Sequence, residues 1–248
     1  MTAAHPTLTA VAAAAEEAGL RLRGALACAP DDQVPPQPDG RASRTLVLLG
    51  NLGGSLWPDF AAGPEFADGG PDPMNRWSAR VVGSLAERFR GLALFPFGGP
   101  PYHPFLRWAQ KAEGLRPSPL GMLIHPVYGL WHAYRGALAL GEALALPDEP
   151  PPAHPCEACA EKPCLSACPV DAFSESGYDV PACTDHLRAA AGADCLTGGC
   201  LARRACPVGR EHVYAPPQAA FHMRAFLTAQ SIPQSTPQPT PQPSGTEP

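Results

Sequence analysis

Apolar residues recur along the first part of the chain with the spacing of helices and then of strands. Residues 7–18 repeat apolar positions with a helical period, and Thr7 and Gly19 are the expected N-cap and stop of this helix. Residues 20–29 then alternate between apolar and other residues. This alternation predicts a strand with one shared face, formed by Leu20, Leu22, Leu26 and Cys28.

The alternation of strands and helices continues toward residue 146. The apolar run at 45–54 predicts a buried strand that ends in a glycine loop. Residues 73–90 predict a helix with one apolar stripe, formed by Trp77, Val81, Leu85 and Phe89. Four further elements are expected: a strand at 92–97, a helix at 104–112, a strand at 121–129 and a helix at 130–144. We therefore predict an α/β (α+β) domain over residues 1–146.

The remaining chain has a different composition. Residues 147–155 are rich in proline and predict a linker, because proline is not accommodated inside regular structure. A cysteine-rich module is expected at 156–229, closed by a helix at 217–229. Residues 230–248 combine proline, glutamine, serine and threonine with few apolar residues, which predicts a disordered tail.

Charge and hydropathy narrow the classes of function. The net charge is -5 and the pI is about 5.9, so no basic surface for nucleic acid is expected. The alanine-rich beginning lacks a basic residue ahead of its apolar run, and Glu16 and Glu17 interrupt that run. No uncharged apolar stretch reaches the length of a membrane span. We expect a cytoplasmic protein without membrane contact, in which clustered cysteines favour metal binding over disulfides.

Eight of the nine cysteines lie between residues 156 and 206, in two groups that each end in Cys-Pro. The first group is C-x2-C-x4-C-x3-C-P, close to the C-x2-C-x2-C-x3-C-P run of bacterial two-cluster ferredoxins. It differs by the insertion of Glu161 and Lys162, for which the loop must bulge. The second group has the looser spacing C-x11-C-x4-C-x5-C-P.

A residue before proline is held in an extended conformation, so the thiol of each Cys-Pro can point toward the neighbouring group. Exchange of these two thiolates predicts two [4Fe-4S] clusters with no thiol left over. One cluster would be held by Cys156, Cys159, Cys164 and Cys206. The other would be held by Cys168, Cys183, Cys195 and Cys200.

Two alternatives use the same thiols. Two four-thiolate zinc sites are possible by ligand count, but zinc ribbons usually have paired C-x2-C knuckles and this chain has one such pair. Disulfides would require an oxidising compartment. Cys28 stands apart from the cluster and is interpreted as a small core residue of its strand.

The cysteine module resembles the C-terminal part of the epoxyqueuosine reductases, which are cobalamin-dependent iron–sulfur enzymes related to reductive dehalogenases. In that family, too, a lone cysteine follows the first Cys-Pro after about fifteen residues, as Cys183 follows Cys168. The family's Lys-Ala-Gly-Leu-Gly turn and Asn-Pro-Glu-Tyr-Gly strand end are similar to residues 111–115 and 125–129. This resemblance implies two clusters beside an α/β domain, and cobalamin as a further candidate cofactor.

The chain also departs from the family. The family's proton-donating aspartate is replaced by the stretch Phe97-Gly98-Gly99-Pro100, and its Ile-Gly-Lys-Asn loop is absent. We therefore expect no appreciable reduction of the modified tRNA base, unless His103 acts as the proton donor.

Three aromatic and histidine residues, Tyr128, Trp131 and His132, are candidates to line a flat cofactor such as a corrin or a flavin. On a helix these residues and Arg135 would share one side, and packing of that side is the favoured interpretation. His103 and His125 flank loops and could donate to a ligand, although ordinary packing also suits them. The glycine loop at 50–55 could cradle a phosphate, but it lacks the P-loop lysine.

These observations predict an iron–sulfur redox protein that passes electrons to a partner protein, to a small-molecule substrate or to a cofactor in its own α/β domain. A cobalamin-dependent reductase and a structural zinc protein are the alternatives. No catalytic residue is assigned, and electron transfer is better supported than catalysis.

Overall fold

The computed structural model describes residues 6–148, 150–174 and 177–231. Its main sheet has four strands in the order β1-β2-β6-β3, formed by β1 (Arg21–Ala27), β2 (Thr45–Leu52), β6 (His132–Leu140) and β3 (Leu92–Leu94). All three strand pairs are antiparallel. The mixed α and β character predicted from the sequence is confirmed, with a small antiparallel sheet and helices around it.

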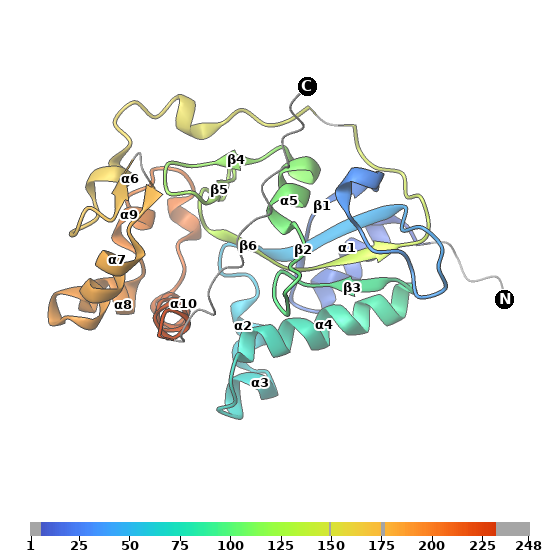
Figure 1. The fold of residues 1–248 in the computed structure, drawn as a ribbon, viewed down its shortest axis with the longest axis horizontal. Coiled ribbons are helices and arrows are strands. Elements are labelled where there is room, and N and C mark those ends of the chain that lie inside the picture. Colours follow the sequence, from blue (N-terminus) through green and yellow to red (C-terminus); the bar gives the residue numbers. More distant parts are fainter. Residues whose placement is uncertain (1–5, 149, 175–176, 232–248) are drawn as a thin grey trace, which may run out of the picture.

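Helices cover both faces of this sheet (Figure 1). Helices α1 (Leu8–Glu17) and α4 (Pro73–Phe89) pack on one face, and α5 (Phe105–Glu113) packs on the other. Strand β2 is buried from both sides: Val47 and Leu49 face α1 and α4, whereas Leu46 and Leu48 face α5. A central strand covered on both faces explains the continuous apolar run seen in the sequence.

The helices predicted at 7–18, 73–90 and 104–112 are confirmed. Thr7 caps α1, since its hydroxyl oxygen accepts the Ala10 N–H at 3.1 Å, and Gly19 follows the helix with a φ of +78°. On α4 the predicted stripe faces the core: Trp77, Val81 and Leu85 are buried and Phe89 packs against the same cluster. Short helices α2 (Trp57–Ala61) and α3 (Pro64–Ala67) were not predicted.

The helix predicted at 130–144 is wrong, because this segment forms strand β6. Its alanine and leucine residues favour a helix by intrinsic propensity. In the fold, however, β6 lies between β2 and β3 and is buried on both faces from Gly136 to Leu140. Periodicity does not distinguish a strand covered on both sides from a buried helix. Gly136 allows the close packing, since a Cβ there would lie 3.0 Å from the side chain of Val82.

The face predicted for β1 is also corrected. A register shift between Leu22 and Gly24 marks a β-bulge against β2. Leu20 and Leu22 therefore pack in the cluster under α1 and α4, whereas Leu26 and Cys28 pack in the cluster under α5. An extra residue moves all later side chains to the opposite face, because the strand period is two.

The segment after β6 runs along one edge of the molecule to the C-terminal helices (yellow in Figure 1). Its described residues between Leu140 and Pro155 form no helix or strand, as expected for the predicted linker.

The remaining elements are short, except for the closing helix α10, which was predicted. They are η1 (Pro30–Asp32), β4 (Arg116–Pro117), β5 (Leu123–Ile124), η2 (Pro155–Glu157), α6 (Pro163–Ser166), β7 (Phe173–Ser174), β8 (Gly177–Tyr178), α7 (Val180–Arg188), η3 (Ala190–Gly192), α8 (Ala193–Gly198), α9 (Leu201–Arg204), η4 (Arg210–His212) and α10 (Pro216–Ala229).

The C-terminal helices are docked against the sheet through a small polar and aromatic joint. The Arg203 guanidinium donates to the Leu130 carbonyl oxygen, with its Nε at 3.1 Å, and lies 4.3 Å from the centre of the Trp131 ring. The Asn51 amide donates to the Tyr214 hydroxyl at 3.1 Å. Of the predicted tail, the structure describes only Gln230 and Ser231, and no described helix is long and apolar enough to cross a membrane.

Candidate functional site

Three thiols of the first cysteine group and one thiol from a distant segment surround a small cavity in the C-terminal part. The cavity is lined by Cys156, Cys159, Cys164 and Cys206. Cys156 lies in η2 and Cys164 in α6, whereas Cys206 follows α9. The other walls are largely apolar and include Ile124 and Leu130. The structure thus brings Cys206 to the three cysteines from which it is about forty residues distant in sequence.

The two-residue insertion in the first group is accommodated by a left-handed turn. Lys162 has a φ of +42°, and Pro163 begins α6 directly after it. The inserted residues therefore reverse the chain between Cys159 and Cys164, so that the thiols of both cysteines line the same cavity. The predicted bulge is present in this form.

A second cavity lies among the following helices. It is lined by the other four thiols, Cys168, Cys183, Cys195 and Cys200. Cys183 is on α7, Cys195 is on α8 and Cys200 is the N-cap of α9, while Cys168 precedes Pro169 in the loop after α6. Phe173, Leu187 and Met223 provide apolar walls. The thiols therefore separate into the two sets expected from exchange of the Cys-Pro residues.

Electrostatic coupling between the thiols follows the same two sets. Burial raises the pKa of the Cys156 thiol, and Cys206, Cys164 and Cys159 raise it further. Burial likewise raises the pKa of Cys183, where Cys168 and Cys195 act in the same direction. Thiols this close cannot all ionise without a cation between them, so metal binding here would release protons.

Backbone N–H groups point at several of the sulfur atoms. The Ala172 N–H donates to the Cys168 sulfur at 3.4 Å. Burial raises the pKa of Cys200, which the N–H groups of Arg203 and Ala202 partly offset. The Val208 N–H acts in the same way on Cys206, whose pKa burial also raises. Such donors stabilise sulfur that carries negative charge and tune the potential of clusters bound to it.

Three arginines lie near the end of the cysteine run, Arg203, Arg204 and Arg210, and the structure separates their roles. Arg210 is close enough to the Cys206 thiol for its positive charge to oppose the rise in the thiol's pKa that burial causes. Arg203 is instead engaged in the joint with Leu130 and Trp131. Arg204 pairs with Asp194, with Nη2 and Oδ2 2.6 Å apart.

Within the described ranges, no group of three or more His, Cys, Asp or Glu residues is placed to hold a metal ion. A single zinc ion requires its sulfur ligands about 2.3 Å from one point. A four-iron cluster instead occupies the space between thiolates that each reach a different iron. Ligation of metal by the eight thiols stays a prediction.

The three residues predicted to line a flat cofactor do not line a common cavity in the described part of the chain. Trp131 is buried between Arg203 and Tyr214. His132 is bound at both nitrogens: its Nε2 donates to the Leu123 carbonyl at 2.9 Å, and its Nδ1 accepts from Arg23 at 3.1 Å. Tyr128 packs against the His212 ring, with centroids 4.5 Å apart. Packing explains these side chains: His132 begins strand β6, and Tyr128 and Trp131 lie in the segment just before it.

Sequence analysis missed a buried polar network beneath the sheet. The Arg23 guanidinium donates to the Glu113 carboxylate at 2.8 Å, and the Tyr134 hydroxyl donates to the other oxygen of that carboxylate at 2.8 Å. Burial raises the pKa of Glu113, and the Arg23 charge opposes this shift. Arg23 also bonds His132, so the network fixes the ring that was considered for cofactor binding. The sequence signal that could have indicated this network is Arg23, a charged residue within the largely apolar strand β1.

The remaining candidates have structural partners. The His103 ring stacks on Trp108 with centroids 5.6 Å apart. His125 accepts from the N–H groups of Val127 and Tyr128 through Nδ1 and so closes its own turn. In the glycine loop at 50–55, the Gly53 N–H is used by the Trp131 carbonyl.

Cys28 is half-buried in the cluster under α5, as expected for a core residue, and burial raises its pKa to about 11. Comparison of the chain with models of known protein families and with curated protein sequences found no match.

Proposed function

We propose that the protein is an iron–sulfur electron-transfer protein that holds two [4Fe-4S] clusters in its C-terminal part. The observation that carries this proposal is the division of eight thiols, four and four, around two separate apolar cavities. Each cavity takes one Cys-Pro thiol from the other half of the cysteine run, the arrangement of two-cluster ferredoxins.

The chain's own residues would hold, shield and tune such clusters. Bound clusters of this type supply one-electron transfer. The four thiolates of each cavity would anchor one cluster, and apolar neighbours such as Leu130 and Leu187 would exclude water from it. The N–H groups at Cys168, Cys200 and Cys206 would lower the energy of the reduced, more negative state. The acceptor is a partner protein or a small molecule.

The alternative of a cobalamin-dependent reductase receives no support from its candidate residues. Trp131 is buried and His132 is bound at both ring nitrogens, so neither is free to contact a corrin. His103, the possible substitute proton donor, stacks on Trp108. No reaction step through cobalamin is therefore derived.

The proposal is tested by analysis of anaerobically purified protein. Two clusters would contribute about eight iron and about eight acid-labile sulfide per chain, with a broad visible absorbance that dithionite bleaches. Zinc bound in place of iron, without sulfide, would instead support the structural zinc alternative.

Pairs of substitutions test how the thiols are shared. Cys159→Ser combined with Cys206→Ser removes two ligands of one cavity, so about half of the iron should remain. Cys183→Ser combined with Cys206→Ser removes one ligand from each cavity, so both clusters should be lost or weakened. If the clusters used the cysteines in sequential order, the two double variants would show the reverse pattern.

A further inference from the structure

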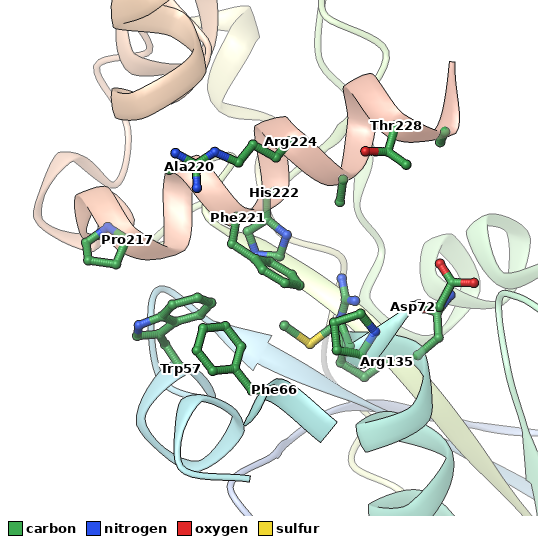
Figure 2. A pocket seen from close by; sticks show the side chains of 15 residues that line it. Trp57, Phe66, Asp72, Arg135, Pro217, Ala220, Phe221, His222, Arg224 and Thr228 are labelled. Carbon is green, nitrogen blue, oxygen red and sulfur yellow. The ribbon is translucent and has the colours of Figure 1, made fainter. Parts of the chain in front are cut away.

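A third cavity lies outside the thiol region, between helix α10 and the sheet. Its volume is about 770 Å³, within the usual range of small-molecule sites. In Figure 2, Phe221 and His222 point from α10 toward Trp57, Phe66 and Arg135, which come from α2, α3 and β6. The pocket is thus built by both parts of the chain.

One wall of this pocket is aromatic. The ring centroids of Trp57 and Phe66 are 5.6 Å apart, and Phe221 lies 5.6 Å from Trp57 and 6.1 Å from Phe66. Phe66 is 40 % exposed although it is a large apolar side chain. An aromatic wall that is left partly open to the pocket favours a ligand with a flat apolar body.

The opposite wall carries an arginine without a partner. Arg135 makes no hydrogen bond or ion pair within the described ranges, and its Nε is fully buried although the residue as a whole is partly exposed to the pocket. A guanidinium keeps its charge in proteins, and a partly buried charge without a counter-ion favours an anion beside it. The unpaired Arg135 side chain therefore indicates an anion that is supplied by a ligand.

A break in the strand register places this arginine. Leu49 of β2 pairs with Gly136, and Gly50 pairs with Tyr134, so Arg135 is the unpaired extra residue of a β-bulge. Strand β3 pairs with β6 only as far as Ala137 and does not cover this position. Bulges re-aim side chains and occur next to functional sites.

His222 adds a polar group beside Arg135. Burial and the charges of Arg135 and Arg203 lower the pKa of His222 to about 3, which leaves a neutral imidazole at pH 7. Such a ring adds a hydrogen bond without adding charge. The pocket also contains Asp72, which forms no ion pair with Arg135, and Arg224, which points away from Arg135 in Figure 2.

We propose that this pocket binds a small organic anion, whose carboxylate or phosphate pairs with Arg135 and whose flat apolar body lies against Trp57, Phe66 and Phe221. The proposal goes beyond electron transfer and does not depend on which metal the thiols hold. Met223 of the same helix lines the second thiol cavity, so the ligand would be separated from those thiols by the width of α10.

The test compares charged and neutral probes with the same rings. The full chain is titrated by calorimetry with 2-naphthoate, 2-naphthyl phosphate and the neutral 2-naphthamide. A charge-assisted hydrogen bond to Arg135 should make at least one anion bind roughly 10- to 100-fold more tightly than the amide. The preferred anion distinguishes a carboxylate ligand from a phosphate ligand.

Arg135→Met keeps the length of the side chain and removes its charge, so it should abolish the preference for the anion. Arg88→Met is the matched control, because Arg88 is exposed on α4 and pairs with Glu17 away from the pocket. A second measurement needs no ligand: removal of this unpaired, partly buried charge should raise the melting temperature of the free protein.

Equal affinity for the anions and the amide, or binding of none of the three probes, would overturn the proposal. A lower melting temperature of Arg135→Met would also overturn it, since it would show that the guanidinium has a structural partner. Iron and sulfide content, measured on the same samples, reports separately on the proposed electron-transfer function.

Discussion

The sheet and the thiol region of this chain differ in how much apolar packing stabilises them. The sheet buries large clusters of aliphatic and aromatic residues between long helices and a central strand. The thiol region consists of short helices and loops, and its own apolar cluster includes the candidate ligands Cys164 and Cys206. Short helices do not hold their conformation without packing. The comparison indicates that the sheet is stable by itself, whereas the thiol region depends on what the thiols bind.

Removal of the proposed clusters should have the largest effect and should make the two regions behave differently. After treatment with a chelator and an oxidant, we expect the amides of α6, α7, α8 and α9 to exchange hydrogen rapidly, because their cross-links are lost. The amides of β2 and α4 should stay protected. Equal loss of protection in both regions would contradict this comparison.

A cavity in the sheet should produce the opposite pattern. Leu48 is completely buried in β2, so Leu48→Ala should lower the free energy of unfolding by about 2–5 kcal/mol. Iron and sulfide content of the folded protein should be unchanged. Leu106→Ala is the matched control, because Leu106 is 64 % exposed on α5 and its truncation should have little effect. Urea denaturation measures both changes.

Acid should weaken the sheet through His132. Burial and the nearby Arg23 charge lower the pKa of His132 to about 3, below its value of 6.5 in the unfolded chain. The unfolded chain therefore binds an additional proton in this window, and stability that is complete above pH 6.5 falls as the pH decreases toward 3. The loss from this group between pH 6.5 and 5 should be about 2 kcal/mol.

The measurement is urea denaturation at several pH values, in which the slope of stability against pH is compared between variants. His132→Asn should make the slope shallower. An identical slope for this variant and the unsubstituted protein would exclude His132 as the titrating group.

The joint between the two regions should give the smallest effect. Arg203→Met removes the hydrogen bonds to the Leu130 carbonyl and the charge over the Trp131 ring, which should cost about 2 kcal/mol. Arg204→Met is the matched control, since the Arg204–Asp194 pair is partly exposed and should contribute less than about 1 kcal/mol. Hydrogen exchange in α10 is the measurement. Equal effects of the two substitutions would show that Arg203 does not hold the joint.

Local pattern was sufficient for much of the fold and for the grouping of the thiols. Thr7 and Gly19 set the ends of α1 by capping and by a left-handed turn, which are properties of the nearest residues. The two Cys-Pro pairs predicted that Cys206 lies with the first group and Cys168 with the second. Proline restricts the residue before it wherever the chain goes, so this information is present in the sequence alone.

Other features arise only when distant segments meet. Residues 130–144 carry helix-forming side chains, yet pairing of β6 with β2 and β3 makes them a strand. The bulges at Arg23 and at Arg135 reverse the faces of two strands, an effect that appears only when each strand is paired with its neighbour. The pocket of Arg135 and Phe221 joins residues from both parts of the chain. Its unpaired guanidinium becomes visible only after every neighbour has been placed, because burial without a partner is a property of the tertiary structure.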